Sequence, residues 1–515
     1  MKYDVIVVGA GSSGCALATR LSDDPNRSVL LLEAGPDFPD PAHMPHELRD
    51  GISTAASSEN STFNWSYSGQ LAPSHSYRTP IPRGKVVGGS SAINGQSFIR
   101  GIPEDFDGWA SLGNGEWAFI KVLPYFRRIE NDLDIRDDFH GSSGPIEIRR
   151  HNREDEQPVQ RAFYAACVAT GFPEDPDVNH PDSSGVGLMP KNNTGGVRMS
   201  MTLTHLNPNR HRLNLTVRPN AQALRVLFEG GSTSSPRATG VEVESGGERF
   251  VVQGEEIVLS GGAVASPHLL MLSGVGPEDH LREFGIPVLH ALPGVGQNLR
   301  DHPGARVSLR VKDNAVLDPS GPWTNLTLRY TATGSPTRND VMISQAYPSG
   351  PPYGDASVGD DFRITCSLEF PRGAGELRLA SSDPHVYPVL DYRYLEDPWD
   401  RERMREAVRL CVRLLGHPSY QPLIKEMINI SHSDLASDEA LDGWLMKNLT
   451  TAIHMSGTCK MGPASDPMAV VDQYCRVHGL EGLRVVDTSV MPDVVRANTN
   501  ATAIMIGERA ADWFE

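Results

Sequence analysis

The sequence predicts an α/β protein whose second lobe is of the α+β type. Two observations indicate this class. The chain opens with a short apolar strand at residues 3–8, a glycine-rich turn, a helical segment and a second apolar strand at residues 29–32. Much later, residues 304–446 alternate as short strands and then take on helical periodicity. A chain of 515 residues is long enough to divide into two or more lobes.

The opening segment is typical of a dinucleotide-binding βαβ unit. Its turn reads Gly9-Ala10-Gly11-Ser12-Ser13-Gly14. Gly9 permits the tight turn, Gly11 lets the backbone approach a pyrophosphate, and Gly14 lets helix and strand pack closely. The N–H groups at the start of the helix are available to phosphates. Glu33, which ends the second strand, is placed to accept hydrogen bonds from a ribose diol. An ordinary α/β turn is the alternative, but the two strands and the acid favour dinucleotide binding.

The composition excludes several classes of function. Lys and Arg total 47 against 64 Asp and Glu, so the formal charge is −17, which argues against nucleic acid or an anionic membrane as a partner. No apolar run approaches the roughly 20 residues of a membrane span. The first strand begins within three residues of the start, so we expect no signal peptide and a cytoplasmic location. The six cysteines contain no C-x-x-C pair; we expect free thiols and no metal site.

The order of patterns along the chain predicts the domains. Residues 215–252 contain short strands that predict an antiparallel meander inserted in the first lobe, and residues 256–263 are another strand running into glycines. The last seventy residues return to the style of the first lobe and end in an amphipathic helix. We therefore predict a nucleotide-binding domain at 1–303, a substrate domain at 304–446 with an antiparallel sheet and helices, and a return to the first domain at 447–515.

A second glycine-rich stretch runs from Arg83 to Gly95. Its small residues could lie directly against a large planar ligand, with Gly and Ser supplying hydrogen-bond donors. A flexible glycine loop is the alternative. The basic Arg83 and Lys85 and the apolar pair at 86–87 argue against that alternative.

Four separated stretches together resemble the glucose–methanol–choline (GMC) oxidoreductase family. Residues 83–94 resemble its first signature and residues 262–276 its second, while residues 454–462 and 482–507 match its C-terminal pattern. The matches occur in family order over nearly the whole chain. The resemblance implies an FAD-dependent alcohol oxidase or dehydrogenase with a Rossmann-like, non-contiguous FAD domain. It also implies a substrate domain whose sheet faces the flavin ring.

The resemblance implies a histidine–asparagine pair for the chemistry. An alcohol becomes a good hydride donor once its hydroxyl proton is removed, so the site needs a base with a pKa near neutral. His454, followed by Gly457-Thr458, matches the family's base, and hydride transfer to flavin N5 is expected. Asn500 matches the position beside the base, where its amide can donate to the developing alkoxide. The start of the last helix is expected to point at the edge of the flavin that becomes negative on reduction.

The same resemblance implies a wider set of contacts. Ile93 stands where some relatives carry the histidine that anchors FAD covalently, so we predict non-covalent FAD. The predicted substrate face comprises Ile453 and the pair Glu369-Phe370. The residues predicted to contact FAD are Gly9, Gly11, Ser12, Ser13, Gly14, Glu33, Val87, Gly88, Ser91, Asn94, Gly95, Ser97, Ala223, Ser260, Gly261, Asp487, Asn498 and Thr499.

Several functional alternatives stay open at this point. The fold could serve a hydroxynitrile lyase that uses His454, or a fatty acid photodecarboxylase, whose flavin-facing cysteine is matched here by Glu369 rather than Cys366. A nicotinamide-dependent or non-catalytic dinucleotide protein would share the opening unit but has no need of the C-terminal motif. The sequence does not identify the alcohol, nor whether oxygen or a quinone accepts the electrons.

Overall fold

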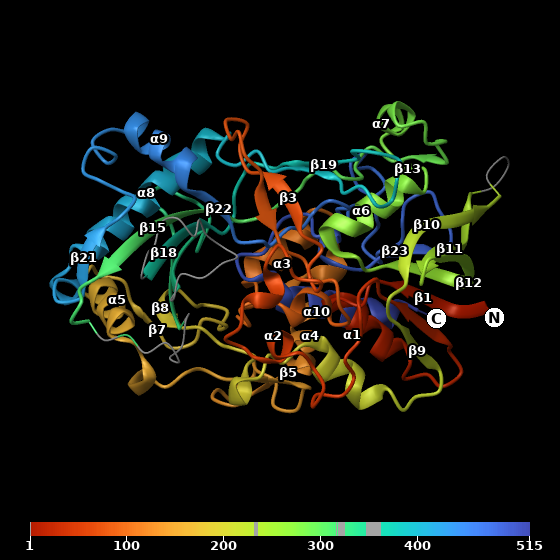
Figure 1. The fold of residues 1–515 in the computed structure, drawn as a ribbon, viewed down its shortest axis with the longest axis horizontal. Helices are drawn as coiled ribbons and strands as arrows, with labels where there is room; N and C mark the ends of the chain where they lie inside the picture. Colours follow the sequence, from red (N-terminus) through yellow and green to blue (C-terminus); the bar gives the residue numbers. More distant parts are fainter. Residues whose placement is uncertain (1, 231–234, 316, 318–324, 347–361, 515) are drawn as a thin grey trace.

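The chain folds into two groups of helices and strands, one around a largely parallel sheet and one around a largely antiparallel sheet. The computed structural model describes residues 2–230, 235–315, 317, 325–346 and 362–514. In the view of Figure 1 the parallel sheet lies to the right, near both termini, and the antiparallel sheet lies to the left. Segments from both ends of the chain meet between them.

The parallel sheet places the opening βαβ unit at its centre. Strand β1 pairs in parallel with β2 on one side and with β12 on the other, in the registers Val7↔Leu31 and Val7↔Val258. Strand β9 extends this sheet beyond β2, and β23, from the C-terminal part, extends it beyond β12. The strands β1, β2 and β12 are buried where they pair with one another, because a parallel sheet is covered on both faces. Their bounds are β1 Lys2–Val8, β2 Val29–Leu32, β9 Leu215–Arg218, β12 Glu248–Leu259 and β23 Leu483–Val485.

The predicted meander is present, and it joins the parallel sheet through one long strand. The first half of β12 pairs antiparallel with β11, and its second half pairs in parallel with β1. The last strand of the predicted meander and the strand predicted at 256–263 are therefore one continuous element, which ends at Leu259. Strand β10 (Gln222–Glu229) forms the outer edge beside β11 (Arg237–Ser245).

Helices from the two ends of the sequence pack together under this sheet. Helix α1 spans Ser12–Leu21, and α10 spans Thr499–Ala510, close to the predicted C-terminal helix. Gly507 of α10 sits so close to α1 that a Cβ there would lie 2.3 Å from the carbonyl oxygen of Ser13. The hydroxyl of Ser12 also donates to Asn500 at 2.7 Å, so the N-termini of the two helices lie side by side. Helix α6 (Gly262–Leu272) also begins near this point, directly after β12.

The second sheet has the strand order β21-β15-β18-β17-β16-β8-β7, with β22 also paired to β15. Strands β7 and β8 come from residues before 303, so the sheet draws on more of the chain than the predicted range 304–446. Strand β8 pairs antiparallel with β16, although the segment around it appears only polar and turn-rich in the sequence. Helix α8 (Pro398–Leu415) contacts β15, β17 and β18. The strands are β7 Glu174–Asp175, β8 Gly185–Leu188, β15 Pro303–Val311, β16 Leu326–Tyr330, β17 Val341–Ala346, β18 Phe362–Leu368, β21 Ile424–Met427 and β22 Leu449–Thr451.

The remaining elements surround these two sheets. A small sheet of order β19-β20-β3-β4 joins residues near 70 to residues near 390. Within the described ranges, no helix is both long and apolar enough to span a membrane. The other helices are α2 His46–Arg49, α3 Pro103–Ser111, α4 Phe119–Ile129, α5 Pro158–Ala169, α7 Glu278–Glu283 and α9 Asp438–Asn448, and the other strands are β3 Tyr67–Gln70, β4 Thr79–Ile81, β5 Glu130–Asp132, β6 Ile146–Ile148, β13 Val275–Gly276, β14 His290–Ala291, β19 Glu376–Arg378 and β20 Val389–Asp391.

Candidate functional site

A cavity of about 500 Å³ lies where the two groups of elements meet. The turn between β1 and α1, the start of α10 and the start of α6 form one part of its wall. Strands of the antiparallel sheet form another part, through Gly304, Arg306, Met342, Thr365 and Ser367. The cavity therefore joins a nucleotide-type cradle to a sheet face, as the resemblance implies.

Most of the residues predicted to contact the cofactor line this cavity, and four do not. Gly14 is used for packing, because a Cβ there would lie 2.0 Å from the carbonyl oxygen of Gly9. Ser91 is buried; its hydroxyl donates to the carbonyl of Gly88 and accepts from the N–H of Met201. Val87 and Gly88 also lie outside the lining. Those that line the cavity are Gly9, Gly11, Ser12, Ser13, Glu33, Asn94, Gly95, Ser97, Ala223, Ser260, Gly261, Asp487, Asn498 and Thr499.

The glycines of the first turn create room for a ligand close to the backbone. Gly9 has φ +104°, and a Cβ there would lie 2.6 Å from the carbonyl oxygen of Ser260, so the tight turn requires glycine. Gly89, from the second glycine-rich stretch, has φ +54° and approaches the Cα of Gly11 so closely that a Cβ would lie 2.6 Å away. The two stretches thus form one cradle. Neither α1 nor α10 carries an acidic residue in its first turn, which leaves the positive ends of both helices available to an anion.

Glu33 lies at the edge of this cradle, at the end of β2. One carboxyl oxygen accepts from the N–H of Ala10 at 3.0 Å and the other from the N–H of Gly35 at 2.9 Å. Burial raises the pKa of Glu33 to about 7, although these backbone N–H groups oppose the shift. Asp487, on the other side of the cradle, accepts from the N–H of Gly262 and from the hydroxyl of Ser266.

The start of α10 places two asparagines differently from the prediction. Asn498 Nδ2 lies 3.1 Å from Nε2 of His454, so Asn498 is the hydrogen-bonded neighbour of the imidazole. Asn500 instead accepts from the hydroxyl of Ser12 at 2.7 Å through Oδ1. The assignment of Asn500 as the neighbour of His454 is thus corrected to Asn498. The two side chains are two positions apart at a helix start and leave the helix in different directions. Asn498 is the N-cap residue of α10 but makes no side-chain cap bond, so its amide is available to His454.

The backbone before His454 takes an unusual conformation that places its side chain in the cavity. Ile453 has φ +64°, a region that β-branched residues rarely adopt and that costs on the order of 1–3 kcal/mol. Two contacts hold it there: its N–H donates to Thr451 Oγ1 at 2.8 Å, and its carbonyl accepts from Arg83 Nη2 at 2.7 Å. Gly457 has φ +82°, and a Cβ there would lie 2.5 Å from the carbonyl oxygen of Asn298. The chain therefore turns sharply on both sides of the imidazole.

The surroundings of His454 favour its neutral form. Burial is the main cause that lowers its pKa well below the usual value, and the nearby His302 and the cationic Arg83 act in the same direction. His302 lies on the far side of the ring from Asn498, with 2.9 Å between the two Nδ1 atoms. Sequence reasoning missed His302, which lies in a turn-rich segment. The signal available there was an Asp-His-Pro run directly before a strand.

The three residues predicted to face the substrate lie in different surroundings. Ile453 lines the cavity. Glu369 does not: it is fully buried at the end of β18, where it accepts from Ser367 and lies 3.5 Å from Nδ1 of His302. Phe370 is not a lining residue either, and the guanidinium of Arg496 stacks over its ring at 4.9 Å. The thiol of Cys366 contacts the carbonyl of Ala407 on α8, so it is not exposed to the cavity.

Known proteins match this chain over its whole length. Residues 3–304 match the N-terminal part of the GMC oxidoreductase family, and residues 371–507 match its C-terminal part. This chain belongs to the GMC oxidoreductase family. It is 36% identical to an oxygen-dependent choline dehydrogenase of Rhizobium etli, a match that covers 99% of this chain and 95% of the relative. A GMC-type oxidoreductase of Rhodococcus erythropolis is also 36% identical, over 99% of this chain and 97% of the relative.

Solved structures of other GMC enzymes have the same fold. Pyridoxine 4-oxidase from Mesorbium loti superposes with a TM-score of 0.89 at 27% identity, over 100% of this chain and 99% of that one. A fungal aryl-alcohol oxidase superposes with a TM-score of 0.82 at 26% identity, over 99% and 98%. This GMC protein is accordingly an oxidoreductase that acts on CH–OH groups, and the reading as a non-catalytic nucleotide-binding protein is excluded.

GMC oxidoreductases depend on FAD, and the cavity residues suit that group. The glycine cradle and two helix N-termini would hold the pyrophosphate, and Glu33 is placed for a ribose. Two buried polar atoms at the start of α10, Asn500 Nδ2 and Asn498 Oδ1, have no hydrogen-bond partner among the described residues. Buried polar groups of this kind normally have a partner, so a polar ligand in the cavity accounts for them.

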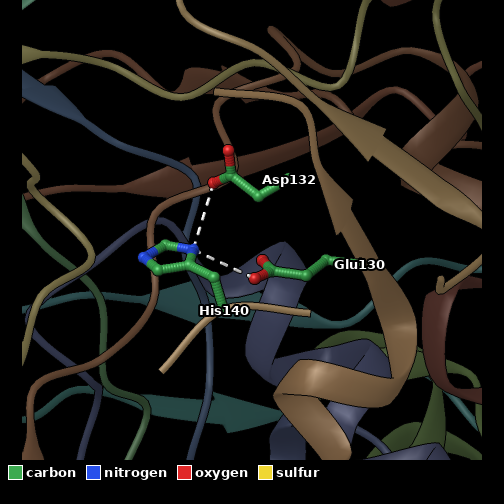
Figure 2. A group of neighbouring side chains, drawn as sticks. All are labelled: Glu130, Asp132 and His140. Carbon is green, nitrogen blue, oxygen red and sulfur yellow. Dashed lines mark hydrogen bonds and ion pairs between the residues drawn. The ribbon is translucent and has the colours of Figure 1, made fainter. Parts of the chain in front are cut away.

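The buried His140 lies outside the cavity lining, in a group of acidic residues (Figure 2). Nδ1 of His140 lies 3.1 Å from both Glu130 and Asp132, and its Nε2 lies 2.9 Å from Asp177. Arg150 binds Asp132 and Asp177, and Arg100 binds Glu130. Burial alone would lower the pKa of His140, but hydrogen bonds to Asp132, Asp177 and Glu130 raise it to about 11. Three carboxylates are thus balanced by three cations, and we refer to these six residues as the His140 cluster.

Proposed function

We propose that this enzyme oxidises an alcohol to an aldehyde or ketone with His454 as the base and non-covalently bound FAD as the hydride acceptor. The observation that carries the proposal is the position of His454. Its Nε2 faces the cavity beside Asn498, at the junction between the glycine cradle and the antiparallel sheet. A neutral imidazole at that point can accept the hydroxyl proton of a bound alcohol.

FAD bound in the cradle would supply the two-electron acceptor. The residues of the chain then have separate tasks. His454 Nε2 accepts the hydroxyl proton, and the amide of Asn498 donates to the alkoxide oxygen as it gains charge. The sharp turns at Ile453 and Gly457 hold the imidazole in place before the substrate arrives. Such preorganisation avoids an ordering cost during the reaction.

The substrate class follows from the sheet wall and from the relatives. Met342 and Ile453 provide apolar surface, and Ser344, Thr365 and Ser367 provide hydroxyl groups. The two solved oxidases named above suggest pyridoxine and aryl alcohols as substrates to test, and the Rhizobium etli relative suggests choline. A mixed apolar and hydroxyl-bearing wall favours an aromatic or heteroaromatic alcohol with polar substituents over a quaternary ammonium compound.

The test is anaerobic flavin reduction by a panel of alcohols. The purified holoenzyme is mixed with pyridoxine, benzyl alcohols, choline and aliphatic alcohols, and the flavin absorbance is followed. We expect bleaching by at least one primary alcohol, fastest with an aromatic one. If no member of the panel bleaches the flavin, the proposed reaction is wrong for this enzyme.

Non-covalent attachment is a separate part of the proposal. Ile93 occupies the position at which a histidine would be needed for a covalent link, and an isoleucine side chain has no nucleophilic atom. Acid precipitation of the holoenzyme should leave the yellow colour in the supernatant. Colour that stays with the washed pellet would contradict this part.

A further inference from the structure

His302 lies directly behind the imidazole of His454 and is itself buried. The two rings are nearly perpendicular, at 80°, and their Nδ1 atoms are 2.9 Å apart. The other nitrogen of His302, Nε2, lies 3.0 Å from the carbonyl oxygen of Val495. Asp301 fixes both backbones, because its Oδ1 accepts from the N–H of His302 and from the N–H of His454. The two histidines are therefore held at a fixed distance.

The contacts define where the protons lie when both rings are neutral. A carbonyl oxygen can only accept, so Nε2 of His302 carries a proton directed at Val495. A neutral imidazole carries one proton, which leaves Nδ1 of His302 as an acceptor. Nδ1 of His454 must then be the donor across the 2.9 Å contact. Its Nε2 then carries the lone pair, which accepts from the amide of Asn498 at the cavity wall.

Glu369 completes the series on the side away from the cavity. Its Oε1 accepts from the hydroxyl of Ser367 at 2.6 Å. Its Oε2 lies 3.5 Å from Nδ1 of His302, is fully buried and has no hydrogen-bond partner among the described residues. A second proton on His302 would sit next to this oxygen. An acceptor of this kind is what a cationic His302 needs.

We propose that His302 and Glu369 are positioning residues that keep His454 as the Nδ1–H tautomer and share the positive charge that forms when His454 accepts a proton. This inference rests on the proposed function for its catalytic consequence, but the tautomer itself does not depend on any substrate. In the reaction, the alcohol O–H bond breaks and an N–H bond forms at Nε2 of His454. The Nδ1 proton of His454 can then move to Nδ1 of His302, so that the charge lies beside Glu369. Only protons move along this path.

Other charged groups surround the three residues. Arg83 lowers the pKa of His454 and so opposes its protonation. Asp301 is occupied by two backbone N–H groups and by the hydroxyl of Thr451. Glu369 is therefore the carboxyl group whose free oxygen faces the imidazole pair. The remaining ionisable groups that interact with Asp301 or Glu369 are Tyr392, Tyr394 and Arg329.

The first test reads the tautomer in the resting holoenzyme by nitrogen-15 NMR of labelled histidine. His454→Asn and His302→Phe identify the two sets of signals, and His478→Gln serves as a control remote from the cavity. We expect a protonated Nδ1 and an unprotonated Nε2 on His454 in the wild type. In His302→Phe the two tautomers of His454 should mix. A wild-type His454 with its proton on Nε2 would overturn the inference, whatever the enzyme's substrate.

The second test compares Glu369→Gln with Glu406→Gln, a half-buried carboxyl on α8 that accepts from the N–H of Thr333. Loss of the negative charge destabilises a cationic histidine pair. The acid limb of the pH profile for flavin reduction should therefore move to lower pH in Glu369→Gln, and the rate on the plateau should fall about tenfold or more. Glu406→Gln should leave both unchanged. If Glu369→Gln binds FAD and keeps the wild-type acid limb, Glu369 has no share in the charge. If no alcohol in the panel reduces the flavin of the wild-type enzyme, the proposed function fails. The NMR result then still decides whether His454 is held as the Nδ1–H tautomer.

Discussion

Two histidines in this protein, His454 in the wall of the cavity and the buried His140, have opposite environments. His454 is bordered by an amide, a second imidazole and Arg83, and it makes no ion pair among the described residues. His140 is bordered by Glu130, Asp132 and Asp177. Burial lowers the pKa of the first, whereas the three carboxylates raise the pKa of the second to about 11. Burial alone therefore does not set the role of a histidine. The neighbours decide whether it is a neutral base or a permanent cation.

The two sites also differ in what surrounds them. The His454 site leaves polar atoms without partners, such as Asn500 Nδ2, and opens into a cavity. The His140 cluster contains matched charges and links the end of α4 to the segment that leads into β8. The His454 site can therefore accept a polar ligand, whereas the charges of the His140 cluster are paired with one another.

Removing the imidazole of His140 should cause a large loss of stability. His140→Gln leaves buried carboxylates with two arginines, so the free energy of unfolding should fall by about 3–5 kcal/mol. Urea denaturation of the holoenzyme gives this quantity. His180→Gln, a half-buried histidine in the neighbouring loop without an ion pair, is the control and should change it by less than about 1 kcal/mol. Equal losses in the two variants would show that the cluster has no special role.

Removing the amide of Asn498 should slow the reaction without unfolding the protein. Asn498→Ala loses the donor to the developing alkoxide, so the rate of flavin reduction should fall by about 10²-fold, or roughly 3 kcal/mol. Asn500→Ala is the matched variant on the same helix end. It should chiefly weaken FAD binding, because Asn500 contacts Ser12 of the cradle. A larger rate loss in Asn500→Ala than in Asn498→Ala would restore the assignment made from the sequence.

The His140 cluster should give a pH dependence of stability on both sides. The raised pKa of His140 means that its contribution is complete below about pH 6.5 and declines as the pH rises toward 11. Hydrogen bonds and arginines lower the pKa of Asp132 and Asp177 despite their burial, so their contribution is complete above about pH 4 and is lost below it.

The measurement is the difference in unfolding free energy between wild type and His140→Gln as a function of pH. This difference should be largest between about pH 4 and 6.5 and should shrink by up to about 1.4 kcal/mol per pH unit on the alkaline side. A difference that stays constant up to pH 10 would mean that His140 is neutral in the folded protein.

A substitution at Ile453 should change the stability and the reaction rate by smaller amounts. Ile453→Gly relieves a left-handed conformation that isoleucine adopts only with strain, so the gain in stability should be about 1 kcal/mol or less, reduced by the loss of buried side chain. Flavin reduction should become slower, because the imidazole next to it is held less firmly. Ile453→Val, which keeps the β-branched shape, is the control. Faster reduction in Ile453→Gly would show that the strain hinders the reaction.

Some features of the fold and of the site could be predicted from the sequence, and others could not. The unit from β1 to Glu33 and the C-terminal helix follow from local patterns, and each forms at the place expected. The second glycine stretch reaches the cavity through Asn94 and Gly95, but its predicted contacts Val87, Gly88 and Ser91 do not line it. The choice between Asn498 and Asn500 could not be made, because it depends on the direction in which each side chain leaves the helix start. The contact of Glu369 with His302 joins residues far apart in sequence. The pairing of β8 with β16 is equally remote, and strand pairing across such a distance leaves no local signal.

Single-turnover flavin reduction measures directly whether a neutral His454 accepts the substrate proton. Wild-type holoenzyme and His454→Gln, both shown to bind FAD, are mixed anaerobically with the best alcohol of the panel at pH 8. We predict that His454→Gln reduces its flavin about 10²–10⁴-fold more slowly, and that high pH, which ionises more of the alcohol, recovers part of the loss. A reduction rate in His454→Gln within a few-fold of the wild type would contradict the account.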